Sequence, residues 1–177
     1  MRFKFLAISA AATAVMAASS ASAATFTFQT ILGNAGEPVP TSLATGSAVV
    51  LFDDAAFTVL VLMSFAGLAN NAPFAHIHCC TTTPGTGSVG VALNFTPLPA
   101  LTTGSYINSF VLSPASFSSL LSGTAAGRSY VNIHTPGTYA AGEIRGFLAP
   151  IPEPGTYGLM GLGLLAVGWA ARRRTNG

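Results

Sequence analysis

Residues 47–65 read SAVVLFDDAAFTVLVLMSF, which is an apolar run, a polar turn at Asp53-Asp54 and a second apolar run over 56–65. Residues two apart in a β-strand point to the same face of the sheet. The second run carries apolar side chains at both alternating sets of positions, so we expect a strand that is buried on both faces. One of these faces is formed by Phe57, Val59, Val61, Met63 and Phe65.

Short runs of this kind recur along the chain between turns that are rich in Gly, Pro and Asn. One helix is expected at 115–121, with Ser113 as its N-cap and Pro114 at its first position. Many short strands with frequent turns predict an all-β domain, a single antiparallel β-sandwich of immunoglobulin-like (Ig-like) or superoxide dismutase-like (SOD-like) type. Strands are expected at 47–52, 56–65, 75–79, 88–95, 106–112, 130–134 and 142–148.

The N-terminal residues follow the order of a secretory signal peptide. A basic start is followed by an apolar run at 5–16 and by the small residues Ala-Ser-Ala at 21–23. A second membrane helix is the alternative, but the apolar run is short and small residues follow it. We therefore expect a cleaved signal peptide over 1–23 and a mature chain that begins at Ala24.

The C-terminal region, residues 151–177, contains a second targeting pattern. Pro152-Glu153-Pro154 is followed by an uncharged, glycine-rich run over 155–171 and then by Arg172-Arg173-Arg174. A transmembrane helix formed by the run is about 25 Å long, which is at the short end of what spans a bilayer. Arginines that follow such a helix remain in the cytoplasm, so we expect the preceding domain to lie on the far side of the membrane.

This order of motifs resembles the bacterial PEP-CTERM sorting signal. The resemblance implies that an exosortase-type sorting protease cuts the tail, which anchors the protein transiently in the inner membrane, and that the protein then reaches the cell surface or the extracellular matrix. A permanent C-terminal anchor is the alternative. The marginal length and the small residues of the run favour a transient substrate.

The domain between these two signals, residues 24–150, is poor in charge. Its four acids and two bases give a net charge of −2, whereas the full chain has +2. Without a basic patch, the domain has no surface for nucleic acid. Its polarity comes from Thr, Ser, Asn and Gly, which suits an extracellular β protein. The six charged residues are Glu37, Asp53, Asp54, Arg128, Glu143 and Arg145.

Three blocks in this domain resemble the CHRD domain, which is named for the repeats of chordin. They are AHIH at 75–78, YVNIHT at 130–135 and GEIRG at 142–146, and the resemblance covers about 26–148. It implies a β-sandwich found in secreted proteins, without an established enzymatic activity. The chain departs from the family pattern at Cys79-Cys80, where glycine and proline are usual.

The chain has three histidines. His76 and His78 are two apart on one strand and point to one face, and His134 ends a strand that we expect beside them. We favour a structural role, in which these rings and Asn132 hydrogen-bond other groups and tie the sandwich together. The alternative is a metal site, since imidazole suits zinc or copper. The His-x-His pattern is also similar to the metal strand of copper-zinc superoxide dismutase, but that site needs more ligands.

Glu143 and Arg145 also lie two apart on one strand. They are expected to form a structural ion pair with each other, or Arg145 pairs with Asp53 or Asp54. Glu143 is also conceivable as a catalytic acid or base, since acids in a polar-poor domain are prone to pKa shifts. The pattern offers no second carboxylate to work with it.

Cys79 and Cys80 are the only cysteines, and an exported chain meets an oxidising compartment. We favour a disulfide between these neighbours. Intermolecular bridges, or Cys79 as a metal ligand, are the alternatives.

Together these features predict an exported bacterial surface or matrix protein that is not an enzyme and acts by binding or cohesion. Its expected partners are the exosortase-type protease, the membrane and afterwards extracellular polysaccharide or matrix protein. The second hypothesis is a redox or metal-storage domain that binds copper or zinc through His76, His78 and His134. A matrix hydrolase is a third, for which the sequence offers no catalytic constellation.

Overall fold

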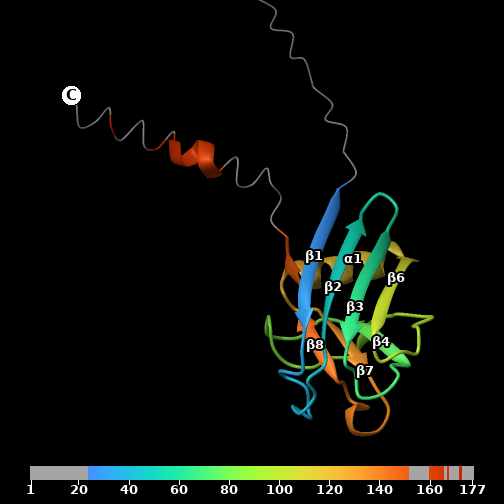
Figure 1. The fold of residues 1–177 in the computed structure, drawn as a ribbon. Helices are drawn as coiled ribbons and strands as arrows, with labels where there is room; N and C mark the ends of the chain where they lie inside the picture. The colour runs from blue at the N-terminus through green and yellow to red at the C-terminus, as the bar shows by residue number, and fades with distance from the viewer. Residues whose placement is uncertain (1–23, 152–159, 166, 168–171, 173–177) are drawn as a thin grey trace, which may run out of the picture.

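The computed structural model describes residues 24–151, 160–165, 167 and 172. Two antiparallel sheets pack face to face around one hydrophobic core, which confirms the predicted all-β sandwich (Figure 1). The five-stranded sheet has the order β6-β3-β2-β1-β9 and the four-stranded sheet the order β5-β4-β7-β8. The first sheet contains β1 (Thr25–Leu32), β2 (Thr45–Asp53), β3 (Thr58–Ala66), β6 (Gly104–Val111) and β9 (Ala149–Pro150). The second contains β4 (Phe74–His78), β5 (Val91–Asn94), β7 (Tyr130–His134) and β8 (Ile144–Phe147).

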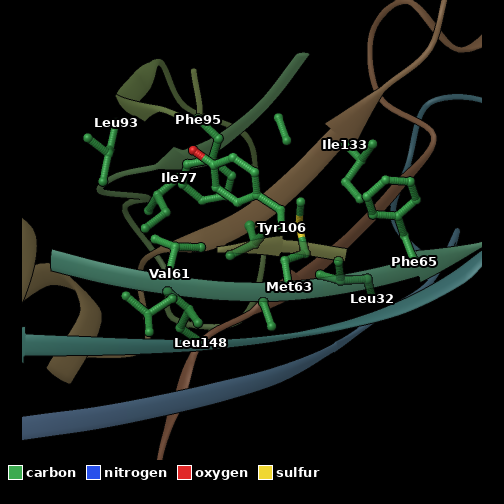
Figure 2. Packing of buried hydrophobic residues seen from close by; sticks show 14 of the residues in the cluster. Leu32, Val61, Met63, Phe65, Ile77, Leu93, Phe95, Tyr106, Ile133 and Leu148 are labelled. Atoms are coloured by element: carbon green, nitrogen blue, oxygen red, sulfur yellow. The ribbon is translucent and has the colours of Figure 1, made fainter. Parts of the chain in front are cut away.

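The core lies between the two sheets and is filled by alternate residues of each strand. Val61 and Met63 of β3 face Ile77 of β4 and Ile133 of β7 across this layer (Figure 2). The expectation that β3 is buried on both faces is wrong. Its second face is half-buried or exposed, with Leu62 37% exposed, because no described segment packs over the outside of this sheet.

The helix α1 (Pro114–Ala125) begins where the sequence predicts. The side chain of Ser113 accepts a hydrogen bond from the backbone N–H of Ser116 at 3.2 Å, as an N-cap does, and Pro114 opens the first turn. Phe117 and Leu120 are buried, and the Phe117 ring lies 5.7 Å from that of Phe52, centroid to centroid. The helix continues four residues past the expected end at 121, up to Ala125.

Strand boundaries differ from the expectation where loops turn toward the second sheet. The predicted strand at 88–95 is formed only over Val91–Asn94, because the carbonyl of Val89 turns to a histidine of β4. β1 was not among the expected strands, although it pairs with β2 along its whole length. The alternation of threonine and phenylalanine at 25–28 is a strand pattern from which β1 could have been predicted.

The targeting segments fall mostly outside the described residues. This holds for the signal peptide at 1–23, for Pro152, Glu153 and Pro154, for Arg173 and Arg174, and for much of the predicted transmembrane helix at 155–171. Residues 160–165 are helical, as is Arg172. In the described part of the chain, no helix is both long and apolar enough to cross a membrane.

Candidate metal centre

The three histidines meet on the outer face of the four-stranded sheet. β4 and β7 are antiparallel, and their register pairs His76 with Asn132 and His78 with Tyr130. Side chains at 76, 78, 130, 132 and 134 therefore share one face, while Ile77, Val131 and Ile133 fill the core on the other. The His76 ring lies 4.9 Å from that of His134 and 5.6 Å from that of His78, between centroids.

One ring nitrogen from each histidine is free to act as a ligand. The potential ligand atoms of His76, His78 and His134 all lie within 4.8 Å of one another. His76 Nδ1, His78 Nε2 and His134 Nε2 are buried and have no hydrogen-bond partner. In a tetrahedral site with metal–nitrogen bonds of about 2.0–2.1 Å, nitrogens are about 3.3 Å apart, so the separations must shorten by up to about 1.5 Å when an ion binds.

Backbone carbonyls fix the orientation of two of the rings. His78 Nδ1 lies 2.7 Å from the carbonyl oxygen of Val89, and His134 Nδ1 lies 3.0 Å from that of Ala140. A carbonyl only accepts, so each neutral ring donates from Nδ1 and keeps a lone pair on Nε2. This is the arrangement by which proteins orient imidazole ligands toward a metal.

The cluster favours neutral imidazole. Burial, and then the proximity of His134 and His78, lowers the pKa of His76 to about 4. Burial is also the main cause that lowers the pKa values of His78 and His134. Metal binding requires the deprotonated ring, and this environment supplies that form at neutral pH.

Arg145 and Tyr130 form a layered support beside His78. The Tyr130 ring stacks on the His78 ring at 4.7 Å with an interplanar angle of 4°, and the Arg145 guanidinium lies 5.1 Å from the Tyr130 centroid. Arg145 also donates hydrogen bonds to Gly87 O at 3.2 Å, to Ser88 Oγ at 3.1 Å and to Gly36 O. It therefore fastens two loops over the face that carries the histidines.

Glu37 is part of this site, although no role was predicted for it from the sequence. Its carboxylate lies 3.9 Å from Arg145 Nε and accepts a hydrogen bond from Asn132 Nδ2. Burial raises its pKa to about 7, against the lowering effects of Arg145 and Asn132. Only six residues in 24–150 are charged, so Glu37 could have been chosen from the sequence as a candidate site residue on that ground.

The expected pairing of Glu143 with Arg145 is wrong, and so is the pairing of Arg145 with Asp53 or Asp54. Glu143 is fully buried and accepts hydrogen bonds from Ser42 Oγ at 2.7 Å, Ala69 N at 2.8 Å and Thr135 Oγ1. It lies just before β8, where the alternation of a strand does not yet hold. Asp53 Oδ1 accepts hydrogen bonds from the backbone N–H groups of Ala55 and Ala56. Asp54 Oδ1 accepts one from that of Ala24.

Cys79 and Cys80 are joined in a disulfide directly after His78. The two sulfurs lie against Gly123 of α1, where any side chain larger than hydrogen would overlap them. The sulfurs are therefore bonded to each other and packed on the helix, and the histidine group contains neither cysteine.

Comparison with known families gives two matches. The family model described as CHRD domain matches residues 26–148. The model described as PEP-CTERM protein-sorting motif matches residues 150–174. No curated protein matches the chain. Both resemblances expected from the sequence motifs are confirmed.

Proposed function

The chain belongs to the CHRD domain family, and from this premise we propose that it is a cell-surface protein whose three histidines hold one zinc or copper ion. Its PEP-CTERM motif marks it for exosortase-dependent sorting, through the membrane, to the cell surface or extracellular space. Neither family is an enzyme family. The proposed role is therefore to bind or store the ion outside the cell.

The observation that carries this proposal is the trio of unpartnered buried nitrogens, one on each histidine. A buried polar atom without a partner costs about 1–3 kcal/mol, and this cluster contains three of them. A purely structural role for the histidines explains why Nδ1 of His78 and Nδ1 of His134 contact backbone carbonyls. It does not explain why the three buried ring nitrogens have no partner. A bound ion satisfies all three nitrogens at once.

The donor set narrows the choice of ion. Three neutral imidazoles suit zinc and copper and are poor ligands for calcium or magnesium, which prefer oxygen. Glu37 lies outside the ligand group, and the group holds no carboxylate within the described residues. We therefore expect selection of zinc or copper over calcium and magnesium.

Calorimetric titration of tag-free protein with Zn²⁺ and Cu²⁺ tests the proposal. We expect one ion per chain in the wild type and a loss of affinity of at least tenfold in His76→Asn, His78→Asn and His134→Asn. Asn94→Ala is a matched control, because Asn94 is the exposed cross-strand neighbour of His76 on β5. Absence of a stoichiometric ion, or equal affinity in all four variants, would contradict the proposal.

A second candidate function is cohesion with matrix polysaccharide or protein through the outer face of the five-stranded sheet. This face exposes Ile31 and Ile107, at 77% and 69%, beside Leu62 and serines. Asp53, at the end of β2, is the one charged residue in the described strands of this sheet. Ile107→Lys should reduce co-sedimentation with purified matrix without changing metal content. Unchanged co-sedimentation would count against cohesion by this face.

A further inference from the structure

We propose that the cavity beside the three histidines is a binding site for a small monovalent anion, which completes the coordination of the bound metal. The inference rests on the proposed metal site and adds a ligand class to it. Three observations support it, namely the position of the cavity, the number of protein ligands to the metal and the charged side chains that line the cavity.

The cavity borders the histidine cluster. It has a volume of about 160 Å³ and is lined by Glu37, His78, Tyr130, Asn132 and Arg145, among others. His78 belongs to both the cavity and the cluster. Asn132 is the cross-strand partner of His76 and lies two residues before His134 on the same face of β7. His78 is the only one of the three histidines that lines the cavity, so the cavity adjoins the cluster at His78.

The protein supplies too few ligands to saturate the ion. The ligand group found among the described residues contains three histidines and no further His, Cys, Asp or Glu. Zinc and copper sites with three protein ligands keep a position for water or another small molecule. That position requires adjoining space, which the cavity beside His78 would supply.

The charges favour an anion over a cation. Arg145 has a side chain only 12% exposed, and its ion pair with Glu37 is long, at 3.9 Å. Glu37 cancels at most the single charge of Arg145, so a divalent ion held by three neutral rings gives the region a net positive charge. A monovalent anion is attracted to such a site more strongly than in water, because partial burial weakens the solvent screening.

The cavity has room for an anion of three or four heavy atoms, such as azide, formate or nitrite. A cavity of about 150 Å³ can hold benzene, so a volume of about 160 Å³ does not by itself exclude a larger anion. The charges around the cavity, and not its size, are therefore what the test addresses.

Azide titration of the copper-loaded full chain, followed by the azide-to-copper absorption band, tests the site. We expect one azide per copper. Arg145→Gln should weaken azide binding at least tenfold, whereas Glu37→Gln should tighten it at least threefold. Copper affinity is measured separately for each variant. Damage to the fold would weaken azide binding in both variants. Opposite changes in azide affinity therefore report the effect of the charges that line the cavity.

The outcomes separate this inference from the proposed function. Lack of bound copper in the wild type overturns both. Bound copper without an azide band, or shifts of the same sign in both variants, overturns the anion site alone. If Arg145→Gln does not fold, Glu37→Gln still decides the question, because unchanged or weaker azide binding in that variant overturns the anion site.

Discussion

The backbone N–H of Ala69 donates a hydrogen bond to Oε1 of Glu143 at 2.8 Å, although 74 positions separate the two residues. Ser42 and Thr135 donate to the same carboxylate from two other loops. Glu143 has no exposed surface, so these bonds replace all of its hydration. The acid of the GEIRG block thus ties together three loops at one end of the sandwich.

Replacing Glu143 by Gln should lower the free energy of unfolding by about 2–3 kcal/mol, because the amide places a donor against a group that also donates. Chemical denaturation measures this change. Asp53→Asn is the matched control, since Asp53 accepts two backbone bonds in an exposed turn, and it should cost less than about 1 kcal/mol. Equal losses in the two variants would contradict the buried role of Glu143.

Glu37 should make the stability of the metal-free protein depend on pH. Its pKa rises from 4.5 to about 7 on folding, so between these values the folded state binds more protons than the unfolded state. Its contribution is therefore greatest below pH 4.5 and is lost as pH rises through 7. Glu37→Gln removes this dependence.

The free energy of unfolding of Glu37→Gln, relative to wild type, should accordingly rise between pH 5 and pH 8, by no more than about 3 kcal/mol. Denaturation in the presence of a chelator measures it. His76 acts with the opposite sign, since its pKa falls from 6.5 to about 4 and its contribution is lost as pH falls. His76→Asn therefore serves as the control, and parallel pH profiles for the two variants would refute the assignment.

Gly142→Ala should destabilise the protein and weaken the metal site. Gly142 has φ of 139°, and a Cβ there would lie 2.9 Å from Asn132 Nδ2 and overlap the Glu37 carboxylate. We expect a loss of about 2–4 kcal/mol in thermal or chemical unfolding, together with weaker zinc or copper binding. Gly137→Ala separates the two causes, because its φ is 79° but no atom lies within 4 Å of its added Cβ. That control should lose about 1–2 kcal/mol and bind metal normally.

The disulfide should matter for stability and not for metal binding. Cys79→Ser/Cys80→Ser is expected to unfold more easily, because it loses the packing of the two sulfurs against Gly123. It should bind zinc or copper within twofold of wild type, because the histidine group contains neither cysteine. Intact mass and thiol labelling without reductant establish the oxidised state first. Reactive thiols in the untreated protein, or a tenfold loss of affinity in the double variant, would argue for a cysteine ligand.

The three arginines of the tail should be required for sorting. Replacing Arg172, Arg173 and Arg174 by Gln is expected to leave unprocessed protein in the cell fraction, since the positive charges orient the preceding segment in the membrane. Fractionation and surface labelling report the destination. Replacement of all three by Lys keeps the charge and should sort normally. Normal display of the Gln variant would oppose the charge-based explanation.

Local sequence was enough to predict most strands and the start of α1. The alternation of apolar residues in β3 and the Ser113-Pro114 pair act within a few residues, so their effect does not depend on distant parts of the chain. The same local rule placed His76 and His78 on one face. The expectation of a doubly buried β3 failed because hydrophobicity alone does not say whether another layer covers a sheet.

Partners of the charged and titratable groups were decided by how the loops fold over the second sheet. Glu37 meets Arg145 across most of the domain, whereas Val89 and Ala140 orient the histidine rings from loops only 11 and 6 positions away. Spacing along a strand predicted a Glu143–Arg145 pair, yet the two side chains lie in different environments. The alternation of side chains along a strand is a property of that strand's own backbone. Which loop covers the strand depends on how the whole sandwich folds, and the candidate metal site forms only where the loops cover the second sheet.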